Sequence, residues 1–96
     1  MTAEQVFDEY YRGVYTAPES VLRLLTIIDA DNVESIMSQA PEQFLPHFER
    51  WIAATDDQTA VFIAPGRPPD VSREMEDLAM RGVPFVEEWL DRRRHA

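Results

Sequence analysis

The sequence contains no cysteine and no lysine among its 96 residues. Without cysteine the protein has no disulfide framework, no thiolate metal ligand and no cysteine nucleophile, which fits a reducing compartment. Without lysine it lacks the amine that forms Schiff bases and the ammonium group of a P-loop. Aldolase and phosphotransferase chemistry therefore loses its usual residues.

Glycine is scarce, and long apolar runs are absent. The three glycines are isolated at turn-like positions and form no phosphate-binding loop. No serine lies in a Gly-x-Ser-x-Gly or Ser-x-x-Lys motif, so the common hydrolase signatures are missing. No apolar run could span a bilayer, and the first residues, with acidic Glu4 and Asp8, lack the basic segment of a secretory signal. We therefore expect a cytoplasmic protein that does not bind membranes.

Positive charge is also sparse. The chain has nine basic residues, all arginine, and 18 acidic residues, which gives a net charge of −9. Residues 1–49 carry nine acidic side chains and only Arg12 and Arg23, a net charge of 2 − 9 = −7. A negative field repels phosphate backbones and anionic lipids. We expect no direct binding to nucleic acid, and a basic surface on another protein is the favoured partner.

Hydrophobic residues make up 45% of the chain and recur at helical spacing. We predict an all-α fold, with one small helical domain over residues 1–96 and five or six short helices packed as an irregular bundle. Its centre is the segment 42–55, where large apolar side chains share one helical face and the aromatic rings can bury the most area. That face consists of Phe44, Phe48, Trp51 and Ile52.

Capping signals predict where several helices begin. Three capping boxes are expected at Thr2 with Gln5, Thr16 with Glu19 and Asp31 with Glu34. The first helix then ends near Gly13, and the next two run near residues 17–29 and 32–40. The helix over 17–29 is apolar almost all round, so we expect it to be covered on more than one side.

Prolines and glycines predict the remaining boundaries. Pro46 should make the first turn of the 42–55 helix irregular around Glu42. A helix capped by Asp70 is expected to end at Gly82, and Pro84 to start a last helix. Residues 59–64 suit either a short strand or a short helical or irregular segment, and we favour the second because no partner strand is apparent. Residues 65–69 are expected to form a stiff loop.

A cluster of tyrosines is the best candidate for a binding surface. Tyr10, Tyr11 and Tyr15 lie near the acidic pair Asp8 and Glu9. Tyrosine is enriched at protein interfaces because its ring buries area while its hydroxyl finds a polar partner. We assign Tyr10 to the core. The protein-binding candidates are Asp8, Glu9, Tyr11 and Tyr15.

Other titratable residues do not form a recognisable catalytic or metal site. His47 lies five residues from Glu42, a spacing that does not place both on one helical face as metal ligands. The adjacent pair Asp56 and Asp57 is expected at a helix end. Glu87 and Glu88 are expected on a solvated face, where Glu88 pairs with Arg92 and Glu87 meets the like charge of Asp91. We therefore expect no cofactor and no metal, and interpret His47 as structural or exposed.

These patterns favour a non-enzymatic, acidic protein-binding module of the adaptor, inhibitor or immunity type, which engages a basic surface of a partner protein. Two alternatives stay open. One is a nucleic-acid mimic that blocks a DNA- or RNA-binding protein, which would require the carboxylates of residues 4–49 to line one face. The other is a small structural homo-oligomer, paired through residues 61–63 or through the last helix.

Overall fold

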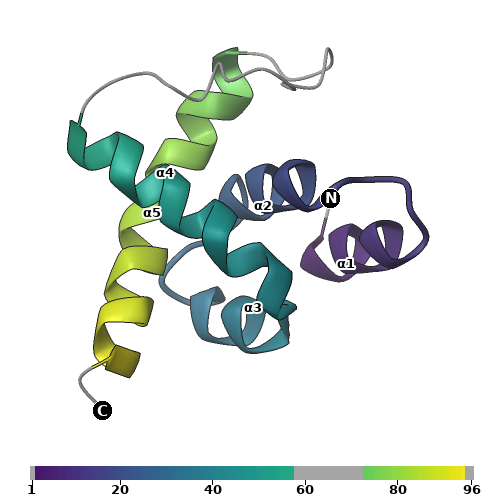
Figure 1. The fold of residues 1–96 in the computed structure, drawn as a ribbon, viewed down its shortest axis with the longest axis horizontal. Coiled ribbons are helices and arrows are strands. Elements are labelled where there is room, and N and C mark those ends of the chain that lie inside the picture. Colours follow the sequence, from purple (N-terminus) through teal and green to yellow (C-terminus); the bar gives the residue numbers. More distant parts are fainter. Residues whose placement is uncertain (1, 58–72, 95–96) are drawn as a thin grey trace.

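The computed structural model describes residues 2–57 and 73–94. The predicted all-α fold is confirmed, because these two ranges contain five α-helices, one short 3-10 helix and no strand (Figure 1). The segments 59–64 and 65–69 lie outside the described residues, so their predicted structure stays a prediction. The helices are α1 (Ala3–Tyr11), α2 (Ala17–Leu25), α3 (Val33–Gln39), η1 (Glu42–Phe44), α4 (Leu45–Asp57) and α5 (Arg73–Arg94).

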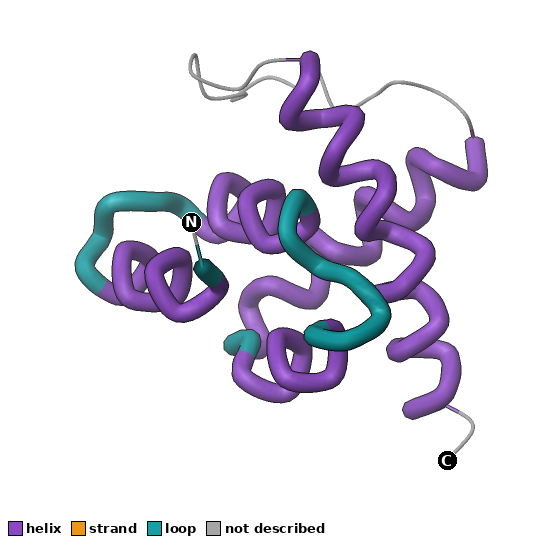
Figure 2. Tube along the Cα trace, turned by 180° about the vertical axis from the view of Figure 1, so that it is seen from behind, coloured by secondary structure: helices purple, strands orange, loops and turns teal. Residues whose placement is uncertain are grey.

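The bundle is built around α2. Helix α5 packs against α2, α3 and α4, and α1 packs against α2 from the other side. As a result α1 and α5 lie towards opposite ends of the longest dimension of the molecule, which measures 38 Å (Figure 1). The view from behind shows the same separation, with the segment between α2 and α3 crossing in front of the helices (Figure 2). None of the described helices combines the length and apolar character needed to cross a bilayer.

The predicted aromatic face forms part of the core. Phe44 and Phe48 are fully buried, and Trp51 is 8% exposed. The ring of Phe44 stacks on Phe7, with centroids 6.3 Å apart, and forms a T-shaped contact with the ring of Tyr10 at a centroid distance of 4.7 Å. These aromatic contacts attach α1 to η1, which leads directly into α4. The prediction for α2 also holds, because six consecutive residues of that helix, 20–25, are all buried.

Both ends of α1 follow the local signals in the sequence. The predicted capping box is present: Thr2 Oγ1 accepts from the amide of Gln5, and the Gln5 side chain accepts from the amide of Thr2. At the other end Gly13 adopts a φ of 83°, a conformation that costs glycine little. The amides of Gly13 and Val14 then donate to the carbonyls of Tyr10 and Glu9, which is the Schellman arrangement.

The boundary between α2 and α3 differs from the prediction. Helix α2 ends at Leu25 and not near residue 29, and the N-cap of α3 is Asn32 and not Asp31. The carboxylate of Asp29 accepts from the amides of Asp31 and Asn32 at 2.8 and 2.9 Å. The Asn32 amide group donates in turn to the carbonyl of Ile27 at 2.8 Å. These side-chain bonds satisfy the backbone of a turn in place of further helix.

The irregular start of the central helix is confirmed. Residues Glu42–Phe44 form the 3-10 helix η1, and α4 begins directly after it at Leu45. Pro46 therefore falls in the first turn of α4, where its missing amide removes no intrahelical bond.

The largest correction concerns the C-terminal region, where the prediction of two helices is wrong. Gly82 and Pro84 both lie inside the single 22-residue helix α5. Gly82 is buried against α2, and a Cβ atom at this position would overlap with the carbonyl oxygen of Leu25. The glycine thus allows the two helices to pack closely and does not mark the end of a helix. Burial of Val83, Val86 and Trp89 on the same helix outweighs the local cost of the proline.

We predict that Gly82→Ala destabilises the protein. In an exposed helix interior the same change would add about 1 kcal/mol of stability. Here the added methyl group meets backbone atoms of α2 that cannot rotate away, so we expect a loss of about 1 to 3 kcal/mol. Urea unfolding followed by circular dichroism measures the free energy of unfolding of both chains. A variant as stable as the parent would contradict the close packing of α5 on α2.

Candidate functional site

The last turn of α1 carries three of the four predicted binding residues. Tyr11 is 68% exposed, the highest value among the exposed large hydrophobic residues that the structure describes, and Val14 just beyond the helix is 59% exposed. The Asp8 side chain is 63% exposed and lies 3.6 Å from the guanidinium of Arg12. Glu9 is half-buried. We call Asp8, Glu9 and Tyr11 the α1 surface.

The α1 surface stands on a fixed support. Tyr10, next to Tyr11 in sequence, is half-buried, and its ring forms a T-shaped contact with that of Phe44. The rings of Tyr10 and Tyr11 meet at a centroid distance of 5.3 Å. Tyr10 therefore contributes to packing, as predicted, and Tyr11 is displayed from a helix that the core holds in place.

Tyr15 has a different environment from Tyr11. It lies in the turn before α2, is half-buried, and its ring is covered by the guanidinium of Arg23 at 4.3 Å from the ring centroid. Arg23 is only 7% exposed, so this cation–π contact lies at the edge of the core. The four predicted residues thus divide into three on α1 and one, Tyr15, that packs against α2.

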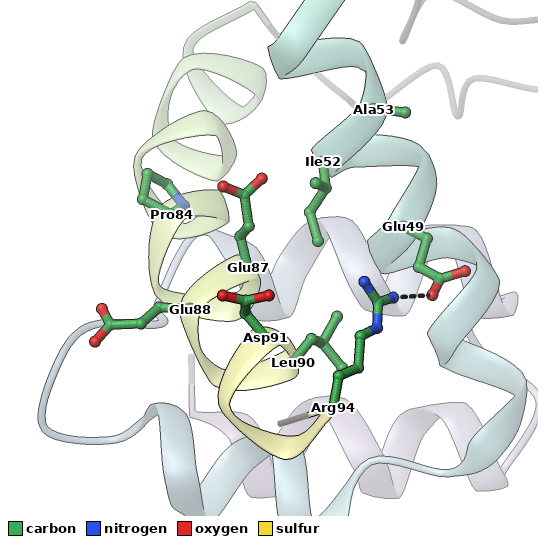
Figure 3. A pocket seen from close by; sticks show the side chains of 9 residues that line it. All are labelled: Glu49, Ile52, Ala53, Pro84, Glu87, Glu88, Leu90, Asp91 and Arg94. Atoms are coloured by element: carbon green, nitrogen blue, oxygen red, sulfur yellow. Dashed lines mark hydrogen bonds and ion pairs between the residues drawn. The ribbon is translucent and has the colours of Figure 1, made fainter. Parts of the chain in front are cut away.

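A groove between α4 and α5 was not predicted. It has a volume of about 760 Å³, and four of its nine lining residues are acidic (Figure 3). Half-buried Ile52 of α4 and Leu90 of α5 supply apolar surface. In Figure 3 the side chains of Glu87 and Asp91 stand on the side of α5 that faces α4, whereas Glu88 points away from α4. We call this site the α4–α5 groove.

The sequence contained one signal for the groove. Glu87 and Asp91 are like charges one helical turn apart, a spacing that slightly destabilises a helix. Glu87 is exposed, as predicted for a solvated face, and this face of α5 lies beside Glu49 and Ile52 of α4. No periodicity shows which face of one helix meets another, so this juxtaposition had to come from the structure.

Side chains at the C-terminal end of α5 contact α4 and α3. Arg94 Nη2 donates to Glu49 Oε1 of α4 at 2.9 Å. The guanidinium of Arg93 lies over the ring of Trp89, 4.7 Å from its centroid, and Trp89 Nε1 donates to Glu34 of α3 at 3.1 Å. The expected pair of Glu88 with Arg92 does not form among the described residues. These contacts anchor the end of α5.

His47 is half-buried on the first turns of α4. Burial, and then the positive charge of Arg50, lower the pKa of its imidazole below the ordinary value of 6.5. Within residues 2–57 and 73–94, no three His, Cys, Asp or Glu side chains come together in a way that could hold a metal ion.

Comparison with known protein families, with curated proteins and with solved structures found no match to this chain. The α1 surface and the α4–α5 groove are therefore the features from which a function can be inferred.

We predict that folding stability falls as the pH drops from about 7.5 towards 5.5, in part because of His47. Unfolded chains accept a proton near the ordinary histidine pKa of 6.5, whereas the folded state resists it. Stability is therefore fully present above that value and is lost as the pH falls through the lower folded pKa. Urea unfolding at several pH values, with His47→Gln as the comparison, isolates this contribution. An identical pH dependence in the variant would contradict it.

Proposed function

We propose that this protein is a non-enzymatic binding module of the adaptor, inhibitor or immunity type, which engages a basic surface of a partner protein through the α1 surface. The observation that carries the proposal is the 68% exposure of Tyr11, three residues after the exposed Asp8 and so on the same side of α1, on a helix whose other side is anchored to the core. A fixed helix presents these side chains with little loss of conformational freedom on binding.

The chemistry of the α1 surface suits a basic partner. A tyrosine ring supplies a large contact area at low entropic cost, and its hydroxyl accepts or donates a hydrogen bond at the rim. The neighbouring carboxylates and the net charge of −9 raise the association rate with a positively charged surface. The same field disfavours nucleic acid as a direct ligand.

The partner is to be identified first. The tagged protein is recovered from its source cells at moderate and at high salt, and near-stoichiometric companions are identified by mass spectrometry. The proposal requires a basic protein that is lost at high salt. Displacement of that partner from DNA or RNA would identify the chain as a nucleic-acid mimic. A solution mass above that of one chain, with no companion, would instead indicate a homo-oligomer.

We predict that Tyr11→Ala weakens binding to this partner by about tenfold or more, because an exposed tyrosine at the centre of an interface commonly dominates its energy. Asp8→Asn should mainly slow association and reduce the salt dependence. Titration calorimetry and stopped-flow kinetics measure the two effects.

Leu78→Ala provides the matched control for this prediction. Leu78 lies on α5 and is 44% exposed, so its truncation removes apolar surface far along the chain from α1. If Leu78→Ala weakened binding as much as Tyr11→Ala, the α1 surface would not be the binding site.

A further inference from the structure

The α4–α5 groove combines a volume typical of ligand sites with a strong excess of one charge. Its volume of about 760 Å³ falls within the roughly 300–1,000 Å³ of small-ligand pockets. Leaving out Glu88, which points away from α4, its lining carries three carboxylates and a single guanidinium, a net charge of 1 − 3 = −2. Ile52 and Leu90 add apolar surface between the charged groups. A ligand that matches this lining carries positive charge at the end of an apolar stem.

The groove already holds one positively charged side chain with an apolar stem, that of Arg94. Arg94 extends from the end of α5 along the groove, and its guanidinium donates to Glu49 on α4 (Figure 3). The two side chains are 63% and 54% exposed, so the ion pair is screened by water and weak. A guanidinium from elsewhere could therefore replace that of Arg94 at little cost. The pair also shows that the spacing of α4 and α5 suits an arginine bridging the two helices.

We propose that the α4–α5 groove binds an arginine side chain in a basic segment of the partner protein, displacing Arg94 from Glu49. The inference rests on the proposed function, because it presupposes a basic partner, and it names the residue that the partner supplies. The arginine stem lies on Ile52 and Leu90, and the guanidinium bonds to the carboxylates of Glu87 and Glu49.

Arginine fits the groove better than other cations. Its planar guanidinium has five donors in a fixed fork and can bond to carboxylates on both helices, whereas the lysine ammonium is a strongly hydrated point charge. A nucleic acid would be repelled by the net negative charge of the lining. A metal ion has no suitable set of three ligands among the described residues.

The test uses the full chain and synthetic peptides. One peptide carries two arginines separated by small residues, and the matched peptides carry lysine or uncharged citrulline at the same positions. Amide chemical-shift changes in NMR titrations locate the site and give the affinity. We expect the arginine peptide to bind more tightly than the lysine peptide, and the citrulline peptide to bind much more weakly.

Two adjacent glutamates provide a matched pair of variants. Glu87→Gln removes a carboxylate on the groove side of α5, and Glu88→Gln removes the same charge from a side chain that points away from α4. We expect Glu87→Gln to weaken binding by about three- to tenfold and Glu88→Gln by less than about twofold. Equal effects of the two would show attraction to net charge alone and would overturn the groove as the site.

Arg94→Gln tests the displacement. Removing the resident guanidinium leaves Glu49 available, so we expect the arginine peptide to bind up to about fivefold more tightly. Unchanged or weaker binding would show that Arg94 does not occupy the site. Binding of acetyl-arginine amide as tightly as the peptide would overturn docking of a protein segment. A solution mass that rises with concentration, and that Arg94→Gln lowers, would assign the groove to the arginines of a second copy and overturn the choice of a partner protein.

Failure of this inference can be told apart from failure of the proposed function. If the captured partner depends on Tyr11 but is insensitive to Glu87→Gln, and the arginine peptide does not bind, the groove proposal is wrong and the proposed function stands. Arginine-peptide binding that depends on Glu87, with loss of partner capture in the same variant, supports both.

Discussion

The close approach of α5 to α2 is the constraint on which the rest of the structure depends. At Gly82 there is no room for a side chain, because the backbone of Leu25 occupies the space that a Cβ atom would need. This contact brings the longest helix against the most buried one. Once α5 is placed there, α4 packs on α5, and the groove between them follows. The absence of a side chain at Gly82 therefore permits the packing that positions the acidic residues of α5.

The distribution of charge follows from the same packing. Because α2 is buried along residues 21–25, most acidic side chains of the described residues lie outside this helix. Two helices that carry them, α1 and α5, lie towards opposite ends of the molecule (Figure 1). On each of them carboxylates stand beside partly exposed apolar side chains. A negative molecule with two such surfaces could hold an extended basic partner at two points, which increases the overall affinity through a high effective concentration.

Local signals in the sequence predicted much of the fold. The aromatic face of Phe44 and Phe48, the cap at Thr2 and the irregular turn before Pro46 depend on neighbours within a few residues, and each is present. The errors arose where distant contacts or competing side chains decide. Gly82 and Pro84 are common signals of helix ends, but packing against α2 holds one continuous helix through both.

The two candidate sites were predictable to different degrees. The sequence placed Asp8 and Tyr11 on one short helix. It could not show that Tyr11 is exposed whereas the ring of Tyr15 is covered by Arg23, because that contact depends on how the turn before α2 folds. The groove was not predictable because it joins residues 49–53 with residues 84–94 across two helices. The like charges of Glu87 and Asp91 can be seen in the sequence. That they line one groove depends on the position of α4.

The outward position of Tyr11 and Asp8 has an evolutionary consequence. Substitutions at exposed positions usually change stability by less than about 0.5 kcal/mol, whereas core changes cost several times more. Phe7 and Tyr10 hold α1 in place from its inner side, so selection on the core leaves the outer side free to vary. The same scaffold could acquire a new partner by changing a few outer residues of α1, without passing through intermediates that fold poorly.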